Sequence, residues 1–170
     1  MKKTILMILL VLFGIVSIAS AASLQLGVKA PDFKLKDTTG KEFSLTASEW
    51  KGKVLLFVAM TIDNSRMNAA VSEEMAKDAG LDKRNIAGAA IFAAPSAEAF
   101  AALKDRQKKK GKIYLIDKDD LITKLWALQP KSSNVVFLDK GRVCRYLYKG
   151  KLSAAEIAKL IQAIKIYQGK

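Results

Sequence analysis

The stretch "KVLLFVAM", residues 53–60, contains an unbroken apolar run that ends at the polar segment "TIDNSR", residues 61–66. A continuous apolar run of this length predicts a central strand with both faces covered. The residues from Asn64 to Asp78 favour a helix, and either Asp63 or Asn64 can serve as its N-cap. The stretch therefore predicts a buried strand that leads directly into a helix.

The rest of the chain alternates in the same way. Before the central strand, Phe33, Leu35, Phe43 and Leu45 alternate with polar residues on either side of a "DTTG" turn, which predicts two short strands. After it we expect a strand at 85–94, a helix at 95–111, a strand from 112, a short helix at 121–128, a hairpin at 133–150 and a helix at 152–167. This order predicts a three-layer α/β/α domain with a mixed central sheet.

The N-terminal residues 1–23, "MKKTILMILLVLFGIVSIASAAS", combine two lysines, an apolar run and a series of small residues. This order is typical of a secretory signal peptide, and the run is shorter than the ~20 apolar residues that a membrane span needs. We expect cleavage after Ala21 or Ala22, a periplasmic location and no stable membrane span afterwards; an uncleaved anchor is the alternative. The predicted organisation is a signal peptide at 1–21 and one folded domain at 22–170.

The composition excludes much of the common catalytic chemistry. The chain contains no histidine and a single cysteine, Cys144. Without histidine there is no Ser-His-Asp or Cys-His nucleophile and no imidazole-based metal site. One cysteine cannot form an intramolecular disulfide. We therefore predict neither a metal nor a cofactor.

Two clusters that could suggest a metal are interpreted as structural. Met60, Met67 and Met75 resemble the soft ligands of copper carriers, but methionine at such strand and helix positions is more common as a core residue. The acidic residues at 117–120 lack the regular spacing and terminal glutamate of a calcium loop. A turn with a helix cap explains them.

The chain is strongly basic, with 29 Lys and Arg against 16 Asp and Glu and a formal net charge of +13. An exported basic domain is attracted to anionic surfaces, so the predicted partner is an unknown protein or an anionic component of the envelope. Nucleic acid is not expected, because the one dense basic run, "KKKGK" at 108–112, has no interleaved aromatic residues. That run is typical of a helix C-terminus.

Four stretches, taken in order, resemble the thioredoxin-like superfamily and in particular its exported redoxin branch: "GVKAPDFKLKDTTGKEFSL", "EWKGKVLLFVA", "SSNVVFLDKGRV" and "YKGKLSAAEI". The resemblance covers the chain from about Leu26 to Ile164. Within the superfamily the chain is most similar to the YtfJ-like group of small periplasmic proteins, which lack the cysteine pair and carry Ser-Ser before a "VVVLDKDGRV"-like strand. Ser132, Ser133 and "NVVFLDKGRV" match that feature here. The resemblance implies a thioredoxin-like fold but no settled activity.

The resemblance also implies a redox site that this chain has lost. Thioredoxin-like oxidoreductases carry Cys-x-x-Cys at the start of the first helix after the central strand, where helix-end amides lower the thiol pKa. Residues 61–66 contain no cysteine, and Ser133 matches the superfamily's cis-proline. We therefore predict a binding or accessory module rather than an enzyme. The candidate binding residues at this surface are Thr61, Asp63, Asn64, Ser65, Arg66, Ser132, Ser133 and Asn134. For Asp63, Asn64 and Ser65 the alternative is that they only cap the helix.

A redoxin-type thiol oxidoreductase or peroxidase that uses Cys144 is the alternative function. Cys144 is expected in an edge-type strand away from any helix N-terminus, where a cysteine is usually a small buried hydrophobe. Neighbouring Arg142 and Arg145 would favour its thiolate if the thiol were reactive. Cys144 is therefore the one catalytic candidate.

Overall fold

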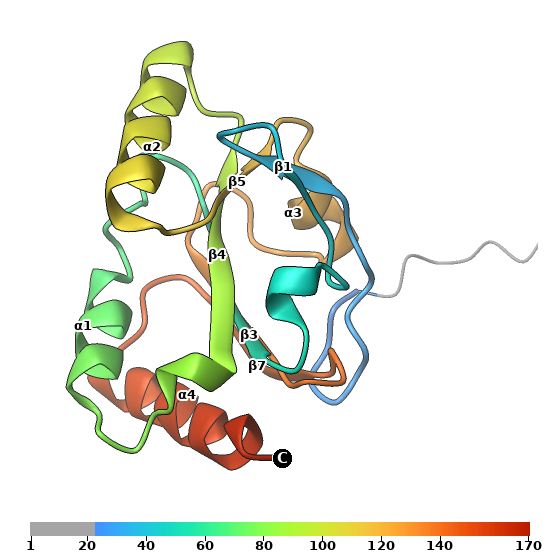
Figure 1. Ribbon diagram of the computed structural model, residues 1–170, viewed down its shortest axis with the longest axis vertical. Helices are drawn as coiled ribbons and strands as arrows, with labels where there is room; N and C mark the ends of the chain where they lie inside the picture. The colour runs from blue at the N-terminus through green and yellow to red at the C-terminus, as the bar shows by residue number, and fades with distance from the viewer. Residues whose placement is uncertain (1–22) are drawn as a thin grey trace, which may run out of the picture.

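The computed structural model describes residues 23–170, and the predicted signal peptide at 1–21 lies outside the described residues. The described chain forms one seven-stranded sheet with helices on both faces (Figure 1). No helix within residues 23–170 is long and apolar enough to cross a membrane. The elements are, in chain order, β1 (Leu35–Asp37), β2 (Glu42–Phe43), η1 (Ser48–Trp50), β3 (Val54–Met60), α1 (Ala69–Lys77), η2 (Lys83–Asn85), β4 (Ile86–Ala93), α2 (Ala97–Lys110), β5 (Tyr114–Asp117), α3 (Leu121–Leu125), β6 (Asn134–Leu138), β7 (Cys144–Lys149) and α4 (Ala154–Gln168).

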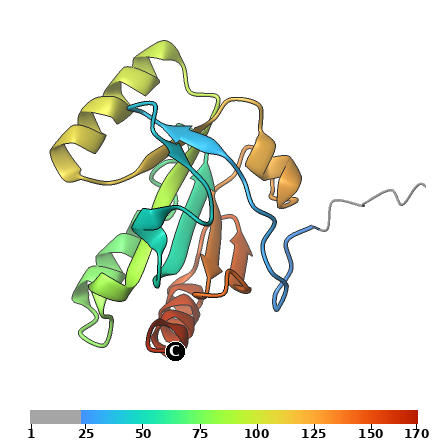
Figure 2. The ribbon, with the colours of Figure 1, turned by 45° about the vertical axis from the view of Figure 1, so that its right-hand side comes forward.

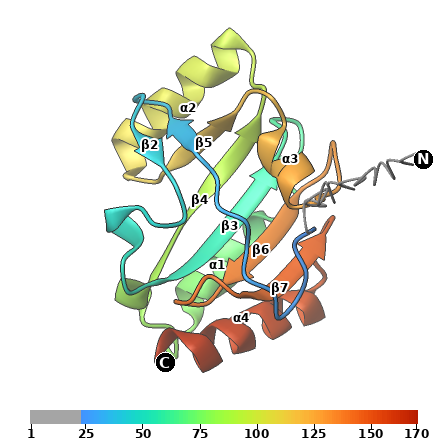
Figure 3. The same cartoon turned by 90° about the vertical axis from the view of Figure 1, so that its right-hand side faces the viewer.

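The predicted central strand is β3, which lies inside a sheet of strand order β2-β1-β5-β4-β3-β6-β7 (Figure 3). β3 runs parallel to β4 along its whole length, and β4 runs parallel to β5. β6 is antiparallel to β3, and β7 is antiparallel to β6. The predictions of a mixed sheet and of an antiparallel C-terminal hairpin are confirmed.

Side chains on the two faces of β3 belong to different cores. On one face Phe57 makes edge-to-face contacts with Trp50, Trp126 and Phe33. Both tryptophans are fully buried. On the other face apolar residues of the sheet pack against α1 and α4, and a smaller cluster packs against α2. Figure 2 shows α1 and α2 on one side of the sheet and α3 on the other.

The first helix departs from the expectation. α1 begins at Ala69 and its N-cap residue is Asn68, so the predicted caps, Asp63 and Asn64, do not cap it. Residues 61–68 instead form a bend and successive turns, in which backbone hydrogen bonds reach back three residues. The prediction of a helix from Asn64 is therefore wrong by one and a half turns.

Side-chain hydrogen bonds explain this difference, because they compete with helical ones. Asn64 Nδ2 donates to Thr61 Oγ1 at 3.0 Å and to the C=O of Lys131 at 2.9 Å. The second contact joins the turns to the loop before β6, which lies 67 residues further along the chain. The segment is held by tertiary contacts that local sequence patterns do not reveal.

Candidate functional site

The carboxyl ends of β3, β4 and β5 meet the start of β6 at one end of the sheet, which we call the carboxyl end. A cavity of about 250 Å³ opens there, between the ends of β3 and β4, α3 and the loop at 129–134. Ligands of open α/β sheets bind outside the carboxyl ends of their strands. This cavity is therefore the candidate site.

The predicted binding residues divide into three groups around this end. Those that line the 250 Å³ cavity are Thr61, Ser132 and Asn134. Those that line a separate cavity of about 190 Å³, between the sheet and the helices α1 and α2, are Ser65 and Ser133. Those that line neither are Asp63, Asn64 and Arg66. The structure thus brings three of the eight candidates to one cavity.

Besides Thr61 and Asn64, two more of the candidates are engaged in structural hydrogen bonds. Asn134 Oδ1 accepts from the N–H of Gln129 at 3.0 Å, and Asn134 Nδ2 donates to the C=O of Gln129 at 3.0 Å. Ser133 Oγ accepts from Asn68 Nδ2 at 2.9 Å. Ser132, by contrast, makes no side-chain hydrogen bond to another residue within 23–170, so its hydroxyl is available to a ligand.

Asn68 is a residue of this region that the sequence did not reveal. Its Nδ2 donates to Ser133 Oγ and, at 3.0 Å, to the C=O of Gly150, while its Oδ1 accepts from the N–H of Leu152 at 2.9 Å. The side chain is 8% exposed. One buried amide therefore joins the start of α1 to β6 and to the loop after β7, and no short-range pattern could have identified it.

Asp117 also lines the cavity, and it supplies the helix cap that is predicted within 117–120, although the N-cap position itself is Asp120, whose side chain makes no capping hydrogen bond. Its carboxylate accepts from the N–H groups of Leu121 at 2.7 Å and Ile122 at 2.8 Å, at the start of α3. Burial raises the pKa of Asp117, and these two hydrogen bonds oppose the rise. The carboxylate is therefore already engaged in hydrogen bonds to the start of α3.

The backbone around the cavity is strained at three positions that are not glycine. Ala94, Asp120 and Lys131 have φ angles of 32°, 53° and 52°, and all three line the cavity. Such conformations cost about 1–3 kcal/mol each, and they concentrate at functional sites. These backbone conformations favour the carboxyl end of the sheet as the candidate binding site.

Cys144 lies at the opposite end of the sheet. It pairs with Leu138 at the end of β6, whereas Ser133 precedes the start of that strand. The Cys144 side chain is fully buried, and the outer edge of its backbone is hydrogen-bonded to Gly27 and Val28. Burial raises the pKa of the thiol from its ordinary value of 9.0 to about 11. These are the properties of a core residue.

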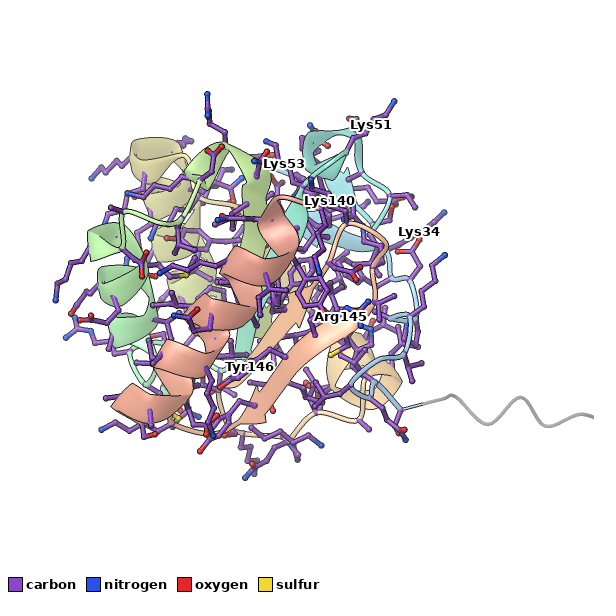
Figure 4. All side chains as sticks on the ribbon, turned by 90° about the horizontal axis from the view of Figure 1, so that it is seen from below. Lys34, Lys51, Lys53, Lys140, Arg145 and Tyr146 are labelled. Atoms are coloured by element: carbon purple, nitrogen blue, oxygen red, sulfur yellow. The ribbon has the colours of Figure 1, made fainter. Side chains whose placement is uncertain are left out.

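The end of the sheet that carries Cys144 is basic, and Arg142 organises it. The Arg142 guanidinium donates to the carbonyls of Leu45, Trp50 and Lys53 at 2.8–2.9 Å, which holds the start of β3 against the β6–β7 turn. Burial lowers the pKa of Arg142. The lysines that line the adjacent cavity of about 690 Å³ are Lys29, Lys51 and Lys140. Figure 4 shows this basic end with Lys51 and Lys140.

Within residues 23–170, no group of three or more His, Cys, Asp or Glu side chains is arranged to hold a metal ion. The polar groups at the carboxyl end are instead the hydroxyls of Thr61, Thr123 and Ser132, the Lys131 ammonium and the Asp120 carboxylate. This set suits the hydrogen bonding of a polar ligand.

Solved thioredoxin-like structures share this fold. The pneumococcal exposed lipoprotein thioredoxin of Streptococcus pneumoniae is 20% identical, with a TM-score of 0.55 over 78% of this chain and 98% of that chain. The thioredoxin domain of a thiol-disulfide oxidoreductase from Bacteroides vulgatus is 13% identical, with a TM-score of 0.61 over 82% of this chain and 97% of that chain. These likenesses confirm the thioredoxin-like fold.

The comparison with protein families is more specific. No curated protein sequence matches the chain. A family profile matches residues 44–167, which run from the segment before β3 to the last turn of α4 and include every residue of the candidate site. This match confirms the YtfJ-like resemblance. The chain belongs to the YtfJ_HI0045 family, which is described as a bacterial protein of unknown function.

Proposed function

We propose that the protein is a periplasmic binding module that keeps the thioredoxin fold and performs no thiol-disulfide chemistry. The observation that carries the proposal is the position of Cys144, the only cysteine of the sequence. Its thiol is fully buried at the end of the sheet opposite Thr61 and Ser132, and its pKa is raised to about 11. A reactive cysteine needs an accessible thiolate, which burial opposes here.

Export is the first part of the proposal. The order of residues in 1–23 supports a cleaved signal peptide. Fractionation of cells that express the full chain should place the protein in the periplasmic fraction, with a mature N-terminus at Ala22 or Ser23. An intact N-terminus in the membrane fraction would favour an uncleaved anchor and overturn this part.

The cavity at the carboxyl end is the proposed binding surface. Support comes from the free hydroxyl of Ser132, the strained backbone at Ala94, Asp120 and Lys131, and the place of the cavity beyond the strand ends. The Lys131 ammonium and the hydroxyls of Thr61 and Ser132 suit an anionic group of a partner. The partner is thus an envelope protein or an anionic envelope component that presents such a group.

Quantitative affinity capture from periplasmic extract tests this surface. Lys131→Glu reverses a charge at the cavity, and Lys140→Glu reverses the same charge at the basic end. We expect the partner to be lost with Lys131→Glu and retained with Lys140→Glu. Equal retention by both variants would overturn the carboxyl end as the binding surface.

The basic end supports a second candidate function, which is adhesion to anionic envelope surfaces. Lys29, Lys51 and Lys140 line one open cavity there. Such contacts between exposed charges weaken as salt is raised. This function predicts salt-sensitive binding to vesicles rich in phosphatidylglycerol that Lys51→Glu with Lys140→Glu abolishes. Binding that the double variant retains would exclude it.

A further inference from the structure

One strand of the sheet has a half that is paired on one side only. β4 pairs with β3 along its whole length, but β5 pairs with it only over Ala90–Ala93. The half of β4 at Ile86–Ala89 therefore has no strand beside it on the β5 side. Figure 1 shows β5 alongside only the upper part of β4.

Most of the backbone groups along this free edge lack protein partners. Ala90 N–H donates to the C=O of Ile113, which fixes the direction in which Ala90 points. Because alternate residues of a strand direct their backbone groups to the same side, Gly88 and Ile86 point to the free edge. Ile86 N–H donates to Lys83 C=O, but within residues 23–170 the Gly88 N–H and the carbonyls of both residues have no partner on that side. Such an edge is a template for another strand.

A groove of about 710 Å³ runs along this edge. Its apolar lining comes from β3, α1, the loop before η2, β4 and β5 and includes Leu56, Val58, Met75, Leu81, Ile86 and Tyr114. Trp50 lines the groove as well, and its Nε1 is the only buried side-chain N or O atom in residues 23–170 without a hydrogen-bond partner. Buried polar groups are normally paired, so this N–H is an unsatisfied donor in the wall of the groove.

The charged residues that line the groove are mostly cationic. They are Lys53, Lys83 and Lys112, against a single acid, Glu49. Lys83 and Lys112 are exposed. A partner with acidic side chains at the rim would be complementary to this arrangement, and a basic partner would be repelled.

We propose that this groove binds an extended acidic segment of a partner protein, which adds as a strand beside Ile86–Ala89. The free backbone groups of Gly88 supply main-chain hydrogen bonds, and the groove takes alternate apolar side chains, as in other strand-addition complexes. At about 3.3 Å per residue, the free half of β4 matches a segment of about four paired residues. This site is separate from the cavity at the carboxyl end, so either can fail without the other.

Hydrogen exchange on the mature protein tests the strand. The probe is an N-acetylated, C-amidated hexapeptide of alternating Val and Glu. We expect it to slow exchange of the Gly88 amide, which is free in the unbound protein. Two matched peptides should leave the exchange of the Gly88 amide unchanged. One carries Lys in place of Glu, which reverses the charge, and the other carries Pro in place of Val, which removes backbone donors. Unchanged exchange of Gly88 at millimolar Val-Glu peptide would overturn the proposal, as would equal protection by either matched peptide.

Calorimetry with the same peptide tests the rim. Lys83→Glu with Lys112→Glu should weaken binding about tenfold, since two complementary charges become repulsive. Lys108→Glu with Lys109→Glu makes the same change in net charge on exposed residues of α2 that do not line the groove, and should leave the affinity unchanged. An equal effect of both pairs of substitutions would contradict a specific contact between the peptide and Lys83 and Lys112. Sodium dodecanoate serves as the other occupant: if it binds the groove and the peptide does not, the site holds a small amphiphile and the proposal is wrong.

Discussion

Replacement of Asn68 by alanine should destabilise the protein strongly, although no short-range pattern marks this residue as special. The change removes three hydrogen bonds and leaves the N–H of Leu152 and the C=O of Gly150 without their partner. A buried polar group that loses its partner costs about 1–3 kcal/mol. The Ser133 hydroxyl can rotate and water can reach part of Gly150, so we expect a loss of about 2–3 kcal/mol in the free energy of unfolding. For a domain of this size that lowers Tm by about 4–12 °C.

Urea unfolding followed by tryptophan fluorescence measures this loss, because Trp50 and Trp126 are both fully buried in the folded chain. Asn64→Ala is the matched control. It removes an amide that is only partly buried, and it should cost less than about 1 kcal/mol. Asn68→Ala and Ser133→Ala should also couple in a double-mutant cycle, since the two side chains are in contact. A loss below about 0.5 kcal/mol for Asn68→Ala, or independent effects of the two changes, would refute the role assigned to this amide.

Three further predictions concern the basic end of the sheet, where Cys144 and Arg142 lie. Iodoacetamide at pH 7.5 should alkylate Cys144 about 100-fold more slowly than an ordinary thiol, because a pKa of about 11 in place of 9.0 lowers the thiolate fraction by that factor. Mass spectrometry measures the alkylation rate, and a rate near that of glutathione would contradict the burial of the thiol. The folded thiol keeps its proton, while the unfolded one loses it above pH 9. The native protein should therefore lose about 2 kcal/mol of stability relative to Cys144→Ala as the pH rises from 8 to 10.5, measured by urea unfolding. Parallel pH profiles of the two proteins would exclude the raised pKa of Cys144. Arg142→Lys should cost about 2 kcal/mol, since one ammonium cannot reach three carbonyls, whereas Arg145→Lys should cost less than about 1 kcal/mol; equal costs would argue against the Arg142 clamp.

The parts of the fold that follow from local patterns could be predicted from the sequence. The apolar run at 54–60 is β3, because a strand buried on both faces needs apolar residues at every position. The helix predicted at 95–111 is α2, which Ser96 and Gly111 bound, since the Ser96 hydroxyl accepts from Ala99 N–H and Gly111 adopts the left-handed conformation. In each case the determining interaction lies within a few residues of the pattern.

The start of α1 and the candidate site depend on contacts between distant residues. Asn64 and Asn68 have an ordinary propensity for a helix start, but their amides bond to groups 67 and 65 residues away. The free half of β4 is likewise not visible in the sequence, since the run at 86–94 is uniformly apolar and the gap arises only because β5 begins at Tyr114. The proposed binding surfaces therefore depend on tertiary structure.

The most direct test of the proposed function is an assay of thiol-disulfide reductase and peroxide-consuming activity. The mature protein and Cys144→Ser would be measured side by side, with a dithiol as the electron donor. A binding module with a buried thiol predicts no activity above the buffer rate in either protein. Activity in the native protein that disappears in Cys144→Ser would show that this cysteine performs redox chemistry, and would contradict the account.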